Sequence, residues 1–312
     1  MDPFRILIVR LGAMGDVIHA LPAVASLKHS FPNSRVSWAI RSRWMPLVES
    51  NPYVDELIAL DKNARSIGAA WKKLRAGRFD LAVDLQGLTQ SALVTLAAKA
   101  DRIVGFHRSQ VSERIASLFY STEVTVSSAH VVDQNLELAA AAGASNIVRT
   151  FPLPEGAAEG SLPEGRFVLA SPLAGWGGKQ WPLEYYAEVA ARLEMPLVVN
   201  GPPDSAQVLA QVQGAHVHLS GLAGLIDATR RAHAVIGVDS GPLHLAAALS
   251  KPGVAIFGPT DPLRNGPYGG SLRVLRAADA STTYKRDISD QEMRRLTPEA
   301  VLEALAAAVC PA

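Results

Sequence analysis

The stretch FRILIVRLGAMGDVIHALP, residues Phe4–Pro22, has the pattern of a buried strand, a glycine-bearing turn and the start of a helix. Its first part, Phe4–Arg10, is a short, mostly apolar run rich in branched side chains, which is typical of a central parallel strand covered on both faces. Gly12 and Gly15 then let the backbone turn tightly. Because open α/β sheets bind ligands outside the carboxyl ends of their strands, this pattern places Asp16 at an expected ligand-binding edge.

Asp16 has two interpretations that the residues alone leave open. Aspartate is a favoured helix N-cap and suits the positive end of the helix dipole. It is equally a carboxylate at the carboxyl edge of a sheet, where a ligand binds. A capping residue can also face such a ligand-binding site. The nearby glycines do not decide between these roles, because Leu11–Gly15 matches neither the dinucleotide fingerprint nor the phosphate-loop pattern.

The length and composition indicate a folded protein of two domains. The chain has 312 residues, 48% of them apolar, with 30 lysines and arginines against 29 acidic residues. These values exclude a disordered or nucleic-acid-coating protein, so no nucleic acid is expected as a partner. The one cysteine, Cys310, argues against a disulfide framework or thiolate metal site and favours a reducing cytoplasm. No apolar run approaches the roughly 20 residues that span a bilayer, so any membrane contact is expected to be peripheral.

Strand and helix patterns alternate on both sides of a proline-rich stretch. The strands expected before it, after the first one, are Arg35–Ile40, Leu57–Leu60, Leu81–Leu85 and Ile103–Phe106. The strands expected after it are Phe167–Ser171, Leu197–Asn200, His216–Leu219, Val235–Val238 and Val254–Phe257. Repeated β-α-β units of this kind predict an α/β protein with a parallel sheet in each half. The stretch Phe151–Gly165 is the expected linker, which gives domains of 1–155 and 156–312 with a cleft between their strand ends.

Three loops at strand ends of the second half carry groups suited to phosphate. Gly175–Lys179 combines glycine amides with a flexible cation, although a glycine-rich turn with a surface lysine explains it as well. Asp239–Gly241 adds a serine hydroxyl and amides at a strand-to-helix junction, where simple helix capping is the alternative. His244 lies just inside that helix, a position more typical of a packing residue than of a catalyst. The third loop, Gly258–Pro262, supplies Thr260.

Metal and hydrolase patterns are missing from the sequence. It contains no Asp-x-Asp pair, no His/Cys cluster at metal spacing and no Gly-x-Ser-x-Gly elbow. A phosphate site here is therefore expected to neutralise charge with lysine, amides and helix dipoles.

The segment Ser66–Ala76 is expected to be amphipathic and basic. It carries Lys72, Lys73 and Arg75. A solvated helix face is the favoured explanation of this cluster, and a patch for an anionic acceptor or a lipid surface is the alternative.

Five motifs together resemble glycosyltransferase family 9, the heptosyltransferases that build the inner core of bacterial lipopolysaccharide. They are VRLGAMGDVIHALPA, DLQGLTQSALV, PLAGWGGKQWP, VDSGPLHLAAAL and FGPTDP, in this order through almost the whole chain. The resemblance implies a GT-B architecture, in which two Rossmann-like domains face each other across a cleft. The first domain is expected to bind a lipid-linked acceptor and the second a nucleotide-sugar donor, with the C-terminal helix able to pack back on the first.

The resemblance also implies an activity and a set of site residues. The activity is inverting, metal-independent transfer of heptose from ADP-heptose to an anionic lipopolysaccharide acceptor, without a cofactor, in the cytoplasm or peripherally on the inner face of the inner membrane. Asp16 matches the general base, and Lys179 matches a lysine on the donor phosphates. The other expected donor contacts are Gly175, Asp239, Ser240, Gly241, His244 and Thr260, with Asp204 as a ribose contact where relatives carry glutamate. The expected acceptor contacts are Gln86, Arg41, Arg43 and Arg108.

Other functions remain open at this point. A transferase of another nucleotide sugar to a different glycan has the same motifs, as does a non-catalytic nucleotide-sugar binder. A Rossmann oxidoreductase or epimerase is disfavoured, because no G-x-G-x-x-G follows the first strand.

Overall fold

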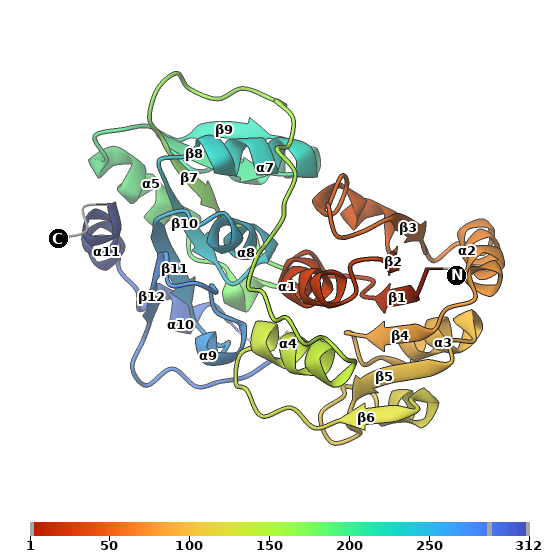
Figure 1. Ribbon diagram of the computed structural model, residues 1–312. Helices are drawn as coiled ribbons and strands as arrows, with labels where there is room; N and C mark the ends of the chain where they lie inside the picture. Colours follow the sequence, from red (N-terminus) through yellow and green to blue (C-terminus); the bar gives the residue numbers. More distant parts are fainter. Residues whose placement is uncertain (1–2, 286–288, 310–312) are drawn as a thin grey trace. The chain divides into compact units, whose positions relative to one another are not determined.

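The chain folds into two compact units, Met1–Pro154 and Glu155–Ala312. The structure, a computed structural model, describes residues 3–285 and 289–309, so Cys310 lies outside the described residues. The division falls inside the proline-rich stretch Phe151–Gly165 (Figure 1). No helix among the described residues has both the length and the apolar character needed to cross a membrane.

The first unit is built on a six-stranded parallel sheet of order β3-β2-β1-β4-β5-β6 (Figure 1). The strands are β1 (Arg5–Val9), β2 (Arg35–Ile40), β3 (Glu56–Ala59), β4 (Leu81–Asp84), β5 (Arg102–Phe106) and β6 (Thr122–Val124). The predicted parallel sheet is confirmed, and the first strand lies at its centre between β2 and β4. Ile6–Val9 is buried, as the continuous apolar run requires.

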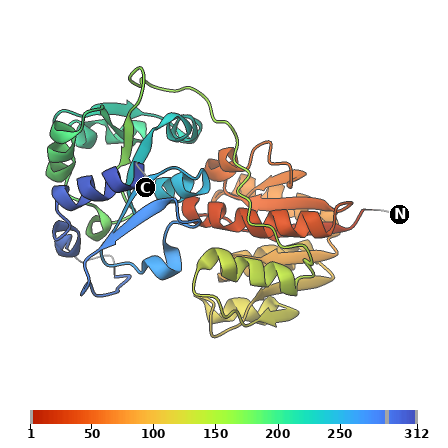
Figure 2. The ribbon, with the colours of Figure 1, turned by 60° about the vertical axis from the view of Figure 1, so that its left-hand side comes forward.

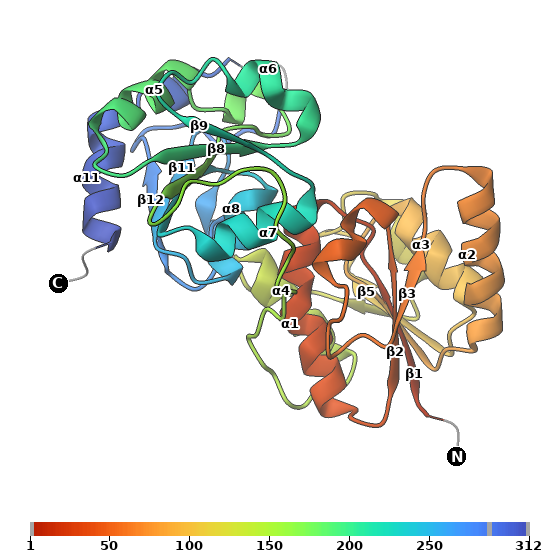
Figure 3. The ribbon, with the colours of Figure 1, turned by 90° about the horizontal axis from the view of Figure 1, so that it is seen from above.

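Helices cover both faces of this sheet. The two long helices α1 (Met14–Ser30) and α4 (Val131–Ala141) pack against each other on one face (Figure 2). The helices α2 (Ala64–Gly77) and α3 (Thr89–Ala98) cover the other face (Figure 3). Two short 3₁₀ segments, η1 (Ser42–Leu47) and η2 (Arg114–Phe119), complete the unit.

The second unit repeats this topology with a sheet of order β12-β11-β10-β7-β8-β9. The strands are β7 (Val168–Ser171), β8 (Leu197–Gly201), β9 (His216–Leu219), β10 (Ala234–Val238), β11 (Gly253–Phe257) and β12 (Leu272–Arg276). The helices are η3 (Gly177–Lys179), α5 (Leu183–Arg192), η4 (Pro203–Ser205), α6 (Ala206–Leu209), α7 (Leu222–Arg231), α8 (Gly241–Ala248), α9 (Pro262–Asn265), α10 (Gln291–Arg294) and α11 (Pro298–Val309). The C-terminal helix α11 packs on α5 and β11 of its own unit.

The strand order fixes where ligands are expected in each unit. Both sheets reverse their order of connection once, between β1 and β4 in the first unit and between β7 and β10 in the second. Crevices open outside the carboxyl ends of strands at such a reversal, and open α/β sheets bind ligands there. The loops that follow these four strands are therefore the parts of the fold to inspect for a site.

Candidate functional site

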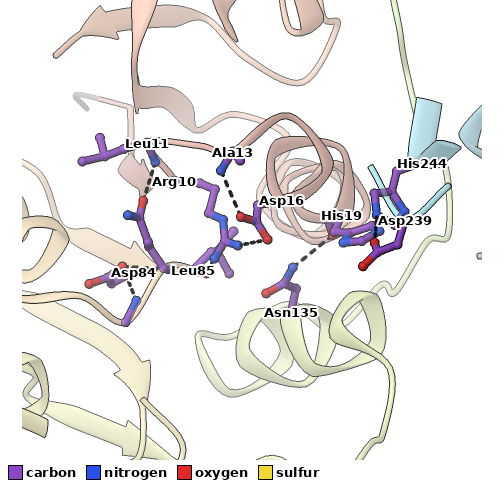
Figure 4. A network of polar contacts seen from close by, with 12 residues as sticks. Arg10, Leu11, Ala13, Asp16, His19, Asp84, Leu85, Asn135, Asp239 and His244 are labelled. Carbon is purple, nitrogen blue, oxygen red and sulfur yellow. Dashed lines mark hydrogen bonds and ion pairs between the residues drawn. The ribbon is translucent and has the colours of Figure 1, made fainter. Parts of the chain in front are cut away.

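Asp16 lies in the loop-to-helix junction after β1, at the reversal point of the first sheet. It is not the N-cap, because α1 begins at Met14 and Asp16 is its third residue. Its Oδ2 accepts a hydrogen bond of 2.9 Å from the backbone N–H of Ala13, and its Oδ1 lies 2.5 Å from Arg10 Nη2 (Figure 4). The side chain is nevertheless 42% exposed. The carboxylate is thus held at both oxygens and still open to a ligand.

Arg10 contacts the candidate base Asp16 and was not among the site residues that the sequence analysis predicted. Its side chain is only 9% exposed, and its Nη1 donates to the carbonyl oxygen of Leu85 in the loop after β4 (Figure 4). The backbone oxygen of Arg10 accepts a hydrogen bond of 3.1 Å from the buried indole N–H of Trp38. A buried cation requires a partner, and here the partner is the candidate catalytic carboxylate. The available signal was a charged residue directly after the apolar run Ile6–Val9.

The loop after β4 is anchored by Asp84, which is fully buried. Its Oδ1 accepts hydrogen bonds of 2.8 and 3.2 Å from the backbone N–H groups of Gln86 and Gly87. Its Oδ2 accepts bonds of 2.8 and 2.7 Å from the hydroxyls of Ser91 and Tyr120. Burial raises the pKa of the Asp84 carboxyl, although these four donors act in the opposite direction. The loop that holds Arg10 is therefore itself rigidly placed.

We expect Asp84→Ala to lower the free energy of unfolding by about 3 kcal/mol or more, because four buried donors lose their acceptor. Urea denaturation monitored by circular dichroism measures this change. Tyr120→Phe removes one of the four hydrogen bonds and serves as the control, with an expected loss of about 1 kcal/mol. If the two variants unfold at the same urea concentration, Asp84 is not the anchor of this loop.

The expected acceptor contacts come from three loops of the first unit. Gln86 Oε1 accepts a hydrogen bond of 2.7 Å from the backbone N–H of Leu11, which ties the loops after β1 and β4 together. Arg41 Nη2 donates to Gln90 Oε1 over 3.1 Å. The guanidinium of Arg43 stacks 4.5 Å from the ring centroid of Trp44.

Arg108 is separated from these two arginines in the sheet. It is exposed in the loop after β5, whereas Arg41 and Arg43 follow β2, and β1 and β4 lie between those strands. The acceptor role of all four residues stays a prediction.

Lys179, Asp239 and His244 are brought together at the reversal point of the second sheet. Asp239 follows β10, and its Oδ2 accepts a hydrogen bond of 2.8 Å from Lys179 Nζ. The Nε2 of His244, on α8, lies 3.6 Å from Asp239 Oδ1. Burial opposes ionisation of Asp239, but the hydrogen bond from His244 and the charge of Lys179 outweigh it and hold the carboxyl pKa well below its usual range. The site thus contains an ionised carboxylate that fixes a lysine.

Two buried hydroxyls of this region have no partner within the described residues. Ser240 is the N-cap of α8, yet its side chain makes no capping hydrogen bond, and its Oγ is buried. Thr260, after the neighbouring strand β11, is 2% exposed and its Oγ1 is also unpartnered. Helix capping therefore does not explain Ser240. Buried polar groups normally find a partner, so both hydroxyls are available to a ligand.

Three further residues were predicted to bind the donor. Gly241 is the first residue of α8. Gly175 is exposed in the loop after β7, where an added Cβ meets no atom within 4 Å, so no steric demand explains a glycine there. Asp204 is exposed in η4, after β8. Within residues 3–285 and 289–309, no group of three or more His, Cys, Asp or Glu side chains is arranged to hold a metal ion.

Comparisons with known proteins match both units. The family profile described as glycosyltransferase family 9 (heptosyltransferase) matches residues 67–294. The chain is 31% identical over 301 residues to lipopolysaccharide heptosyltransferase 1 of Pseudomonas aeruginosa, covering 86% of this chain and 82% of that protein. It is 29% identical over 309 residues to lipopolysaccharide heptosyltransferase 1 of Escherichia coli K12, covering 88% and 93%. Its structure is similar to that of the E. coli heptosyltransferase WaaC with ADP, with a TM-score of 0.78, 26% identity, and coverage of 96% and 98%.

Proposed function

This chain belongs to glycosyltransferase family 9, and we propose that it moves heptose from ADP-heptose to an acceptor in the inner core of lipopolysaccharide. Two observations on relatives support the choice of substrates. The curated relatives are lipopolysaccharide heptosyltransferases, and the similar WaaC structure contains ADP. The family and the two-unit α/β fold agree with the resemblance that the five sequence motifs carry.

The donor diphosphate is proposed to bind at the start of α8. The observation that carries this proposal is a set of polar groups at the ends of neighbouring strands, namely the unpartnered buried hydroxyl of Ser240 at the N-cap of α8, that of Thr260 after β11, and Lys179 paired with Asp239 after β10. The first N–H groups of α8 add donors and the positive end of a helix dipole. Together these groups supply hydrogen bonds and positive charge to an anion. Asp239 holds the lysine in place before the donor arrives.

The transfer is proposed to be a single displacement that inverts the anomeric centre. The acceptor hydroxyl attacks the anomeric carbon of the donor sugar, and its proton passes to the carboxylate of Asp16. The bond from the anomeric carbon to the β-phosphate oxygen breaks, and ADP leaves with the electron pair. Lys179 and the α8 amides stabilise the charge that develops on the leaving diphosphate. Each role requires only lysine, amides and a carboxylate, so the proposed step uses no metal.

The acceptor is proposed to be an anionic glycolipid bound by the first unit. Asp16 is exposed at the carboxyl edge of the sheet, and three arginines follow strands at the same edge, Arg41 and Arg43 after β2 and Arg108 after β5. Guanidinium groups suit phosphate because they offer paired N–H donors. A lipid-linked acceptor also implies that the protein works in peripheral contact with the inner face of the inner membrane.

We expect isothermal titration to show selective binding of ADP-heptose over ADP-glucose, GDP-mannose and UDP-glucose. A transfer assay on a deacylated inner-core acceptor with the preferred donor then tests the reaction. Selectivity is expected because only the correct sugar and base fill the donor site without leaving buried polar groups unpaired. Tight binding of a different nucleotide sugar would change the proposed substrate. Binding of ADP-heptose without transfer to any acceptor would make the protein a non-catalytic binder.

A further inference from the structure

One side of the first unit exposes an unusual number of large apolar side chains. Among the described residues, eleven large hydrophobic side chains are exposed, and six of them belong to α2, α3 and η2. They are Ile67, Trp71, Leu93, Leu96, Ile115 and Leu118. Leu118 is 80% exposed and Ile115 is 59% exposed. We call these six residues the apolar patch.

The six side chains belong to one layer of the fold. Helix α3 packs against α2 on one side and against η2 on the other. This layer covers the face of the sheet opposite to α1 and α4 (Figure 3). Ile67 and Trp71 are four residues apart, and Leu93 and Leu96 are three apart, so each pair lies along one side of its helix. Large exposed apolar areas of this kind mark interaction surfaces on soluble proteins.

The same layer is strongly basic, with the exposed carboxylate of Glu113 at the N-cap of η2. The helices α2 and α3, their C-cap residues and η2 contain seven cationic side chains and no carboxylate. The seven are Arg65, Lys72, Lys73, Arg75, Arg78, Lys99 and Arg114, all of them exposed. The chain as a whole is balanced, with 30 basic and 29 acidic residues, so the imbalance is local.

Most of these cations are available to a partner. In the described part of the chain, Lys73 alone among the seven forms an ion pair, with Glu56 Oε1 at 3.5 Å. The guanidinium of Arg75 lies 5.2 Å from the ring centroid of Trp71, at the junction of the apolar and basic residues. Tryptophan is favoured at the boundary between lipid headgroups and acyl chains, and basic residues near it attract anionic headgroups.

We propose that the apolar patch and the seven surrounding cations dock this protein on an anionic phospholipid surface. Such a membrane has an apolar acyl layer that can bury the apolar patch and negatively charged headgroups that attract the cations. A second copy of the chain is a poor occupant, because a two-fold contact through this surface sets cations against cations. This inference deepens the proposed function, since it locates the membrane contact that a lipid-linked acceptor requires.

The patch is connected to the loops that carry the candidate acceptor residues. Gln90, in the first turn of α3, accepts the hydrogen bond from Arg41. Glu113, just before η2, accepts a hydrogen bond of 2.8 Å from the backbone N–H of Thr89 at the start of α3. Helix α3 therefore belongs to the layer that carries the apolar patch and also contacts the proposed acceptor residues. An acceptor anchored in the membrane beneath the patch is thus expected to be presented at this end of α3.

The test is co-sedimentation of the full-length protein with lipid vesicles in the absence of any sugar. We expect binding to vesicles of phosphatidylcholine and phosphatidylglycerol in equal amounts, little binding to phosphatidylcholine alone, and release by added salt. Ile115→Ser/Leu118→Ser is expected to weaken binding by at least about tenfold through lost apolar burial. Lys72→Gln/Arg75→Gln is expected to weaken it by about tenfold or more.

The matched control is Leu263→Ser/Arg264→Gln in the second unit. Leu263 is 75% exposed and Arg264 is also exposed, so this pair removes the same kinds of groups from another surface. The proposal is overturned if the wild-type protein does not bind anionic vesicles. It is also overturned if the control loses as much affinity for them as the two double variants of the docking surface. It is also overturned if sedimentation velocity shows that the patch variants abolish a dimer.

Transfer to a deacylated, water-soluble acceptor separates this proposal from the proposed function. Both double variants of the docking surface are expected to retain that activity, because none of the four substituted residues is placed in the proposed acceptor or donor site. Loss of vesicle binding with retained transfer supports the docking surface. Vesicle binding by a protein that transfers no heptose would leave the docking surface standing and reject only the proposed reaction.

Discussion

Replacement of Asp16 with asparagine is expected to lower the turnover number of heptose transfer by about 10²- to 10⁴-fold, the range found when a general base is removed. The carboxylate takes the proton from the attacking hydroxyl, and an amide of the same shape has no such capacity. Binding of ADP-heptose is expected to change little, because the proposed donor contacts lie on the second unit. Initial rates at saturating acceptor, together with a donor titration, measure both quantities.

A second substitution separates the chemistry of Asp16 from its place in the fold. Both substitutions remove the carboxylate from Arg10, but asparagine keeps one oxygen that can still accept the hydrogen bond from the N–H of Ala13, whereas alanine offers none. Asp16→Ala is therefore expected to be less stable than Asp16→Asn by about 1 kcal/mol or more, while both are inactive. Asp101→Asn, at an exposed position before β5, is the charge-matched control and should keep full activity. Near-normal turnover in Asp16→Asn would reduce Asp16 to a structural residue.

Lys179→Ala is expected to lower kcat/KM for the donor by about 10²- to 10³-fold. The ammonium group is proposed to stabilise the departing diphosphate, so the loss should appear in kcat as well as in donor affinity. Steady-state kinetics with varied ADP-heptose measure this effect. Unchanged kinetics would remove Lys179 from the site.

Lys179→Ala is also expected to destabilise the fold, and a double variant shows whether the unpaired charge of Asp239 is the reason. Lys179→Ala leaves the buried carboxylate of Asp239 with His244 as its one charged partner among the residues that the structure describes, which is expected to lower the free energy of unfolding by about 2–3 kcal/mol. Lys179→Ala/Asp239→Asn removes the stranded charge and is expected to recover most of this stability but no activity. If the double variant is no more stable than Lys179→Ala, the ion pair does not organise the site.

The pH dependence of folding follows from the same pair. Because the pKa of Asp239 in the folded protein lies below its usual value, the ionised group stabilises the fold above the unfolded pKa of about 3.9. This stabilisation is lost as the pH falls through the folded pKa. The wild-type advantage over Lys179→Ala, measured by urea denaturation, is therefore expected to be full at neutral pH and to shrink in acid.

The sequence predicted most of the strands because their signals are local. Phe4–Arg10 and Val235–Val238 are short apolar runs followed by glycine or a capping residue, and β1 and β10 lie where these runs predict them. The edge strands β6 and β12 were not predicted. Both are half-exposed at a sheet edge, so their residues lack the continuous apolar run that marks a central strand. Asp16 was expected to begin α1 but is its third residue, which is within the usual error of a helix boundary.

By itself, the sequence determined the two-unit α/β architecture and the kinds of groups that stand after each strand, including Asp16, Lys179 and Asp239. Those features depend on periodicity and on residues within a few positions of one another. Only the tertiary structure decided which of these groups meet. Lys179 and Asp239 are 60 residues apart, and Arg10 reaches Leu85 across 75 residues. These partners are neighbours because β10 pairs with β7 and β4 pairs with β1. That pairing depends on how whole helices pack on both faces of the sheet, which no local sequence pattern encodes.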